Sequence, residues 1–364
     1  MTIGLIKCSE DDLVALVPKV VSKLIKDSFE VVFEKESGLN AGYIDQEYIN
    51  AGAVPMAREQ ILSSTDIIVT VSGIDKSELK LIPGSSYLIG KFNTNSDLNT
   101  QLEIASFKTM SLDKLPRTTF AQAMDVLSSL ASLSGYKSVV VGAEHYPGYF
   151  PMMTTSAGTM PPARVLILGA GVAGLQAIAT ARRLGAVVEA FDVRSAVKEE
   201  VQSLGAKFIE VEGSTDDAKA GGYAVEQSEE YIAKQKELIH QSAAKADVVI
   251  TTAAIPGKKA PVLVEERTIN EMKPGSVVVD LAASTGGNCT LTQNEKTVEH
   301  KGVKVIGNSR LYNSMAKQSS LVYSNNLYSF MKFVFKEGLE NIPFDNEIVI
   351  KTTITQSKES ALTA

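Results

Sequence analysis

A glycine-rich hexapeptide, GAGVAG at residues 169–174, has the residue types and the spacing to bind a phosphorylated ligand. It directly follows a short apolar run, Val165–Leu168, and opens a helical pattern, and this context makes an otherwise common motif more specific. Gly169 permits a tight turn, Gly171 lets the backbone approach a pyrophosphate, and Gly174 lets the helix pack close to the strand. Because the free N–H groups at a helix start favour phosphates, the pattern predicts a dinucleotide site.

An acidic residue follows the next predicted strand at the spacing that dinucleotide-binding folds use. Asp192 comes directly after Val187–Phe191, where a carboxylate accepts hydrogen bonds from the adenosine ribose. The same carboxylate would repel a 2′-phosphate, so we expect NAD(H) to bind in preference to NADP(H). Arg194 opposes this preference, because an arginine can pair with that phosphate. We give more weight to Asp192, which holds the fingerprint position, and expect Arg194 either to stack on adenine or to remain solvated.

A second group of polar residues lies in the segment 116–129, at the start of a predicted helix, Phe120–Gly135. Its members are Arg117, Gln122, Asp125, Ser128 and Ser129. On a continuous helix Gln122, Asp125 and Ser129 would share a face, with Ser128 beside it. These side chains either line a cleft at a domain junction or form a solvated face on which Arg117 pairs with Asp125. The residues alone leave both interpretations open.

The remaining composition excludes several classes of chemistry. The chain has 364 residues, which suggests two domains, and its net charge of −6 gives no reason to expect a nucleic acid partner. Cys8 and Cys289 imply neither a disulfide framework nor a metal site, and the three histidines are scattered. We therefore predict no bound metal. The sequence contains no run of about 18 apolar residues, so we expect no membrane span. The N-terminus fits a first strand and turn and not a signal peptide.

The elements that must position these residues are short apolar runs that alternate with helical segments. In the middle of the chain the predicted strands are Val165–Leu168, Val187–Phe191, Phe208–Val211, Val248–Thr252, Val277–Leu281 and Val303–Ile306. The predicted helices include Val172–Leu184 and Glu229–Ala244. Continuous apolar strands alternating with helices indicate a parallel sheet covered on both faces, and six of them predict the order 3-2-1-4-5-6.

The N-terminal part repeats this pattern without a glycine fingerprint. Its predicted strands are Ile3–Ile6, Glu30–Glu34, Ile67–Val71, Ser86–Ile89 and Thr109–Ser111, with helices at Pro18–Ile25 and Leu98–Ser106. The predicted fold class is therefore α/β, with two Rossmann-like doubly wound parallel-sheet domains separated by a cleft. We expect residues 1–137 with 318–364 to form one domain and residues 138–317 the NAD(H)-binding domain. The helices Phe120–Gly135 and Tyr323–Phe335 would join them.

A long polar connection, Glu212–Ser228, separates the third and fourth strands of the second domain. It contains Gly213, Gly221 and Gly222. A connection of this length is often functional, but a solvated surface excursion has the same composition.

The chain resembles the NAD(H)-binding component, domain I, of proton-translocating NAD(P) transhydrogenase. The matching segments are Pro116–Tyr136, Gly169–Arg194, Ala220–Ala224, Thr251–Pro261, Met272–Asn288 and Gly302–Gly307. The resemblance covers nearly the whole chain. It is carried mainly by the PRTTFAQAMDVLSS segment together with TTAAIPGKKAP, since the glycine fingerprint is shared by many dehydrogenases.

The resemblance implies a Re/Si-specific transhydrogenase component that passes hydride directly from NADH to NADP held on a separate domain. A membrane domain would couple this transfer to proton movement. The resemblance also implies a homodimer, peripheral to a membrane on its cytosolic or matrix-like side.

The resemblance also assigns roles to particular residues. Arg117, Asp125 and Ser128 would position the nicotinamide carboxamide, and Gln122 would reach the ribose and face the incoming NADP. Tyr223 would be the tip of a mobile loop that closes over the nucleotide. Further family nucleotide contacts fall on Thr118, Thr119, Val172, Asp192, Val193, Arg194, Gly222 and Ala254.

Two alternatives stay open at this stage. Alanine dehydrogenase shares this fold, but it carries an arginine in an early turn and a histidine in its first domain. Here that turn reads Ser9–Val14 without arginine, and no histidine precedes His145. The other alternative is a binding module, because this chain has neither membrane helices nor a clear NADP domain and holds NADH without a natural hydride acceptor.

Overall fold

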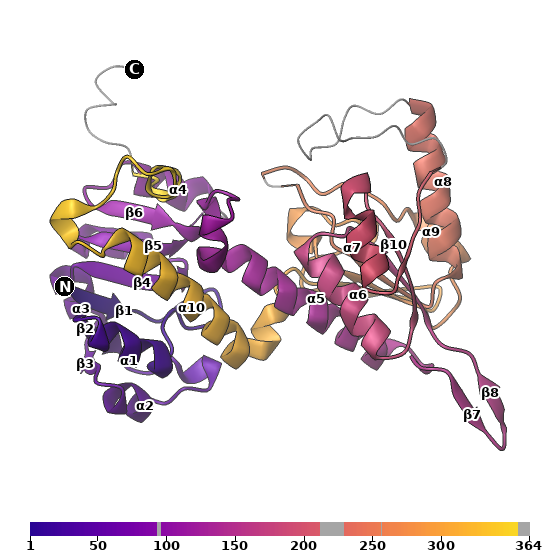
Figure 1. The fold of residues 1–364 in the computed structure, drawn as a ribbon, viewed down its shortest axis with the longest axis horizontal. Coiled ribbons are helices and arrows are strands. Elements are labelled where there is room, and N and C mark those ends of the chain that lie inside the picture. Colours follow the sequence, from indigo (N-terminus) through magenta and orange to yellow (C-terminus); the bar gives the residue numbers. More distant parts are fainter. Residues whose placement is uncertain (93–95, 212–228, 256, 356–364) are drawn as a thin grey trace. The chain divides into compact units, whose positions relative to one another are not determined.

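The computed structural model describes residues 1–92, 96–211, 229–255 and 257–355. The chain divides into two compact units, residues 1–130 with 313–364 and residues 131–312 (Figure 1). The long helix α5, Val126–His145, contains residues of both units. The second boundary falls in the 3-10 helix η8, Leu311–Met315. The helix α10, Ala316–Val334, which we expected to carry the chain back, therefore belongs wholly to the first unit.

The first unit is built on a parallel sheet with the strand order β3-β2-β1-β4-β5-β6. Its strands are β1 Thr2–Leu5, β2 Glu30–Glu34, β3 Val54–Met56, β4 Ile67–Ser72, β5 Tyr87–Lys91 and β6 Lys108–Ser111. Five of them were predicted. The sequence did not predict β3, because it has only three residues, is largely exposed and contains Pro55. Proline has no N–H to donate to a neighbouring strand, so it is tolerated mainly in an edge strand, which has a neighbour on one side only.

Helices cover this sheet. They are α1 Pro18–Lys26, α2 Asp45–Asn50, α3 Arg58–Ser64, α4 Ser96–Glu103, α10 and α11 Glu347–Thr352, with 3-10 turns η1 Leu39–Ala41, η2 Lys76–Leu81, η3 Leu112–Lys114, η4 Phe120–Met124 and η9 Leu339–Asn341. After α11, Ile354 donates its amide to the carbonyl of Thr109 at 2.9 Å. The chain thus places one more extended segment beside the β6 edge.

The second unit contains a seven-stranded sheet with the order β11-β10-β9-β12-β13-β15-β14. Its strands are β9 Arg164–Leu168, β10 Val187–Phe191, β11 Lys207–Phe208, β12 Val248–Thr251, β13 Val277–Asp280, β14 Lys296–His300 and β15 Val303–Gly307. The six parallel strands follow the predicted order. The antiparallel edge strand β14 was not predicted, because its sequence KTVEH is mostly polar and exposed.

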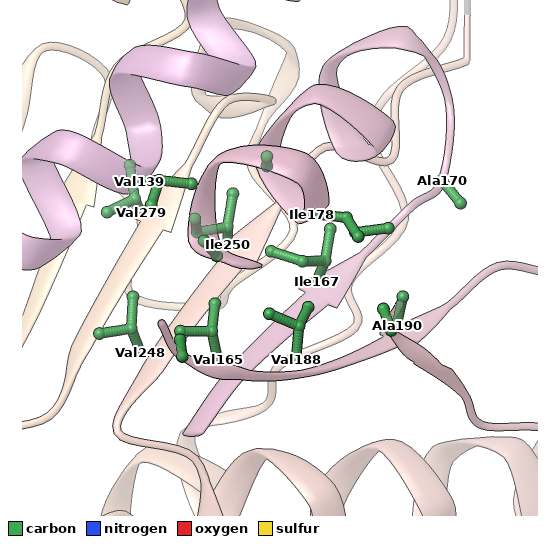
Figure 2. Close-up of a cluster of buried hydrophobic side chains, with 14 of the residues drawn as sticks. Val139, Val165, Ile167, Ala170, Ile178, Val188, Ala190, Val248, Ile250 and Val279 are labelled. Carbon is green, nitrogen blue, oxygen red and sulfur yellow. The ribbon is translucent and has the colours of Figure 1, made fainter. Parts of the chain in front are cut away.

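Apolar side chains project from both faces of this sheet. One face carries Val165, Ile167, Val248 and Ile250, which pack with Ile178 of the helix α6, Val172–Arg183 (Figure 2). Residues between them in the strands, such as Leu166 and Val249, face the helix α8, Glu229–Lys245. The other helical elements are α7 Lys198–Ser203, α9 Glu266–Glu271, η5 Ser195–Val197 and η7 Ala283–Thr285, and a hairpin joins β7 Met153–Thr155 to β8 Gly158–Met160. This is the two-sided burial expected of a parallel sheet.

Within the part of the chain that the structure describes, α5 is the one helix long and apolar enough to cross a membrane. This is weak evidence for a span, because the core helix of a soluble protein passes the same test. Val126 and Val139 of α5 are both fully buried, so part of this helix lies in the protein core.

Candidate functional site: a glycine turn at the carboxyl edge of the second sheet

The glycine turn joins β9 to α6 and gives each of its three glycines a different role. Gly169 has a positive φ of 103°, and a Cβ there would lie 2.6 Å from Oγ1 of Thr252. A Cβ on Gly174 would lie 1.8 Å from the carbonyl oxygen of Gly169, so only glycine lets α6 approach the turn this closely. A Cβ on Gly171 would meet nothing within 4 Å. The open side of the turn thus lies at Gly171, at the start of α6, where helix N–H groups attract a phosphate.

Asp192 is held against this turn by backbone and side-chain donors. Its Oδ2 accepts the amide of Ala170 at 2.7 Å, and its Oδ1 accepts the amide of Arg194 at 2.9 Å. The Arg194 guanidinium adds two more hydrogen bonds at 2.9 Å, Nε to Oδ1 and Nη2 to Oδ2. Arg194 therefore forms a bidentate ion pair with Asp192, an arrangement that we did not expect, while its side chain stays 39% exposed.

This ion pair shifts the titration of both groups. Burial raises the pKa of Asp192, but the hydrogen bonds from Arg194 and Ala170 outweigh it and leave the pKa below its usual value. The hydrogen bonds to Asp192 raise the pKa of the Arg194 guanidinium. The carboxylate is therefore ionised at neutral pH and stays an acceptor. Beside it, the residues Val172 and Val193 are 46% and 37% exposed, which leaves apolar surface next to the turn.

The segment after β12 forms the neighbouring side of the turn. Oγ1 of Thr252 donates to the carbonyl of Gly169 at 3.0 Å. The fully buried Asn288 accepts the amide of Ala253 at 3.0 Å and donates to its carbonyl at 2.8 Å. These bonds place the exposed Ala254 at the same edge of the sheet as the glycine turn.

Asn288 is itself held by Asp280, the last residue of β13. The Asp280 carboxylate is fully buried and accepts hydrogen bonds from the amides of Ala282 and Asn288, at 2.9 and 2.7 Å, and from the Thr292 hydroxyl at 2.6 Å. Sequence reasoning assigned no role to Asp280 or Asn288. A signal was available, because an aspartate that ends the run VVVD occupies the carboxyl end of a parallel strand, as Asp192 does.

The predicted helix Phe120–Gly135 is interrupted, and this prediction was wrong. Residues Phe120–Met124 form the 3-10 turn η4, Asp125 is extended with ψ 91°, and α5 begins at Val126. Asp125 caps α5, since its Oδ1 accepts the amide of Ser128 at 2.9 Å and its Oδ2 accepts the Ser128 hydroxyl at 2.5 Å. An aspartate at this position favours a helix start over a continuing helix. Gln122, Asp125 and Ser129 therefore do not share one helical face.

Arg117 and Gln122 lie on the exposed side of this turn. Among the described residues neither side chain has a hydrogen-bond or ion-pair partner, so the pair between Arg117 and Asp125 that we considered is not formed. Thr118 and Thr119 are exposed beside them. The turn is supported from behind by α10, whose Asn326 donates to the carbonyl of Ala123 at 2.8 Å. Two polar side chains are thus left available for a ligand or a partner.

The early turn that lacks an arginine is held by a buried acid. Oδ2 of Asp11 accepts the Ser72 hydroxyl at 2.5 Å and lies 3.7 Å from Nζ of Lys91. Asp11 lies in the connection after β1, and Ser72 and Lys91 end β4 and β5, so these contacts close the carboxyl edge of the first sheet at this point.

The predicted site residues thus fall into two groups, one in each unit. The second unit brings together the glycine turn, Asp192, Arg194 and their neighbours Val172, Val193 and Ala254. The first unit holds the short stretch from Arg117 to Ser128. Gly222 and Tyr223 lie outside the described residues.

These features define a class of protein with two Rossmann-like units, one of which carries a glycine turn suited to a dinucleotide. Residues 7–134 match the alanine dehydrogenase/PNT N-terminal domain, and residues 138–361 match the alanine dehydrogenase/PNT C-terminal domain. The chain belongs to this alanine dehydrogenase/PNT family.

Within the family the chain is more similar to transhydrogenases. It is 42% identical over 360 residues to the first part of NAD(P) transhydrogenase subunit alpha of Rickettsia prowazekii, covering 96% of this chain and 93% of that protein. The protein of the same name from Rhodospirillum rubrum is 44% identical over 333 residues, 88% of this chain and 86% of that protein. A crystal structure of transhydrogenase from Sinorhizobium meliloti superposes with a TM-score of 0.89 at 40% identity, over 98% of this chain and 99% of that one.

Alanine dehydrogenases are more distant. That of Methanococcus maripaludis is 25% identical over 362 residues, 94% of this chain and 89% of that protein. A solved L-alanine dehydrogenase has a TM-score of 0.81 at 23% identity, over 97% of this chain and 94% of that one, which shows the shared fold alone. The comparisons confirm the prediction of a transhydrogenase-type chain over the alanine dehydrogenase alternative.

Proposed function

We propose that this chain is the NAD(H)-binding component of a Re/Si-specific, proton-translocating NAD(P) transhydrogenase. The observation that carries the proposal is the similarity, over nearly the whole chain, to relatives named as the first part of subunit alpha of this enzyme. The open glycine turn supports the NAD(H)-binding part of the proposal, because it has room for a pyrophosphate at Gly171 and at no other glycine of the motif. Catalysis of hydride transfer needs little more from the protein than binding and orientation.

The residues of the second unit fit NAD(H). The N–H groups at the start of α6 would hold the pyrophosphate, and the ionised Asp192 would accept hydrogen bonds from the adenosine ribose. Val172, Val193 and Ala254 would contact the dinucleotide at the edge of the turn. The negative charge of Asp192 disfavours a 2′-phosphate, so this site prefers NADH to NADPH.

The residues of the first unit would act on the nicotinamide end. When bound, NADH supplies the hydride from C4 of its nicotinamide ring. Arg117, Asp125 and Ser128 position the carboxamide, Thr118 and Thr119 flank them, and Gln122 reaches the ribose and faces the incoming NADP. Because Ser128 is fixed on Asp125, its hydroxyl is held at one place before the ligand arrives.

Proximity is the main catalytic contribution in this proposal. Two rings held about 3–3.5 Å apart need little further help for direct hydride transfer. Tyr223, in the glycine-bearing segment Glu212–Ser228, would close over the site with Gly222 and exclude water.

The partners follow from the same proposal. The relatives are named as one part of a subunit, and such a name implies further parts of the enzyme. We infer an NADP(H)-binding domain as hydride acceptor, a membrane domain that couples the transfer to proton movement, and a second copy of this chain in a homodimer. The chain would be peripheral to a membrane on its cytosolic or matrix-like side.

Two assays in parallel test the proposal. The chain is mixed with a transhydrogenase NADP(H)-binding domain, and hydride exchange from NADH to an NAD analogue of distinct absorbance is followed. The same chain is incubated with alanine and NAD. We expect exchange in the first assay and no turnover in the second. The opposite pair of results would favour an alanine dehydrogenase.

A further inference from the structure

An acid stands at the same place in both units of the chain. Leu5 pairs with Phe33, which Glu34 follows, and in the second unit Leu168 pairs with Phe191, which Asp192 follows. In each unit the backbone amide two residues after the first strand donates to this acid at 2.7 Å, from Lys7 to Glu34 and from Ala170 to Asp192. The two carboxylates therefore occupy equivalent positions in two sheets of the same strand order.

Each of these acids is paired with an arginine, but the two arginines are held differently. Arg58 donates Nη1 to Glu34 at 2.8 Å, and its Nε and Nη2 to the two carboxylate oxygens of Glu78 at 2.6 and 2.9 Å. It is thus fixed between two carboxylates. Among the described residues the Arg194 guanidinium has Asp192 as its single hydrogen-bond partner, and its side chain is 39% exposed. Arg58 is held by two carboxylates, whereas Arg194 is held by one and is more exposed.

The carboxylate of Asp192 has no acceptor position to spare. A carboxylate offers about four lone-pair sites, and four N–H groups fill them, two on each oxygen. Two of the donors are backbone amides, of Ala170 and Arg194, which belong to the turn itself. The other two are the Nε and Nη2 groups of Arg194. An adenosine ribose brings two hydroxyl donors of its own, so it must displace the guanidinium to bind both.

We propose that Arg194 is an internal competitor for the ribose subsite: its two guanidinium N–H groups occupy the positions of two ribose hydroxyls on Asp192 and leave as the dinucleotide binds. This inference rests on the proposed function, since it requires NAD(H) on the glycine turn. It makes Arg194 a residue that modifies the selectivity that Asp192 gives the site. The arginine competes with the ribose of NADH for Asp192. Once released, it is a cation available to the 2′-phosphate of NADPH. It therefore reduces the preference of the site for NADH over NADPH.

The test is a titration of the whole chain with NADH and with NADPH for the wild type, Arg194→Gln and Arg194→Lys. Asp192 keeps both backbone donors in the variants, so its carboxylate stays in place. The Arg194 side chain is 39% exposed and that of Asp192 is 7% exposed. We expect Arg194→Gln to bind NADH about fivefold more tightly, which corresponds to about 1 kcal/mol. The same variant should bind NADPH more weakly. Arg194→Lys keeps the positive charge but not the two parallel N–H groups of the guanidinium, so it should keep its affinity for NADPH.

Arg183→Gln is the matched control, because Arg183 is an exposed arginine at the end of α6 in the same unit. It should leave both affinities unchanged. Weaker or unchanged NADH binding by Arg194→Gln would overturn the inference, since it would make the arginine an ordinary ligand contact or a bystander. If the wild type and Arg183→Gln bind no NADH, the proposed function itself fails, a result that is distinct from a failure of the competitor role.

Discussion

Two substitutions in the glycine turn should separate an effect on ligand binding from an effect on stability. Gly171 and Gly174 belong to the same motif, but a Cβ on the first would meet nothing within 4 Å, and a Cβ on the second would lie 1.8 Å from the carbonyl oxygen of Gly169. We predict that Gly171→Ala folds normally and loses NADH, whereas Gly174→Ala loses stability.

The magnitudes follow from this geometry. Gly171 has φ −77° and ψ −167°, which alanine adopts without strain, and fewer unfolded conformations stabilise the variant by about 0.4–1 kcal/mol. Loss of the helix-capping preference of glycine offsets this by a similar amount, so the free energy of unfolding should change by less than about 1 kcal/mol. The new methyl group lies where a pyrophosphate must approach, and we expect NADH affinity to fall at least tenfold, about 1.4 kcal/mol.

Gly174→Ala should behave in the opposite way. Relieving its overlap with the Gly169 carbonyl requires α6 to shift, and overpacking of this kind costs about 1–3 kcal/mol. The melting temperature should fall by about 2–4 °C for each kcal/mol of lost stability. Thermal melts and NADH titration of both variants are the measurements. A Gly171→Ala variant that is fully folded and binds NADH like the wild type would show that no pyrophosphate lies on Gly171.

Three further predictions concern the rate of hydride transfer, the segment Ala220–Ala224 and the pH dependence of stability. Gln122→Asn should slow hydride transfer strongly while NADH still binds, as measured by exchange rate and titration; a loss of binding in proportion to rate would refute the positioning role. Deletion of Ala220–Ala224 should reduce the rate more than the melting temperature, and an unchanged rate would remove the segment from the mechanism. The pKa of Asp192 is lowered by folding, so its stabilisation is present above its ordinary value of 3.8 and is lost as the pH falls through the folded value. The difference in unfolding free energy between the wild type and Asp192→Asn should therefore shrink below about pH 4, whereas a difference independent of pH would contradict the assigned ion pair.

The central strands of both sheets and the order of the second sheet were predictable, because buried parallel strands are continuous apolar runs. The run VVEAF predicted the bounds of β10 to the residue, and EVVFE did the same for β2. The edge strands β3 and β14 were missed, since half-exposed edges lack an apolar pattern and depend on pairing with a neighbour.

The site was predictable where a residue determines the local backbone conformation. It was not predictable where a side chain could pair with any of several groups. The positive φ of Gly169 follows from the motif itself. The break at Asp125 does not, because its residues also fit a helix, and capping by Asp125 together with the hydrogen bond from Asn326 decides between the two. The pairing of Arg194 with Asp192 is a similar choice among several geometries that the sequence allows equally.

In the proposed reaction, hydride passes directly between two nucleotides, one of which this chain holds. NADH that carries deuterium at the transferred position of C4 is mixed with the chain and an NADP-loaded transhydrogenase domain, and the products are analysed by mass spectrometry. We expect the label at C4 of NADPH, none in water, and none in alanine when pyruvate and ammonium are supplied instead. Label in alanine, or a solvent-exchanged hydrogen in NADPH, would contradict it.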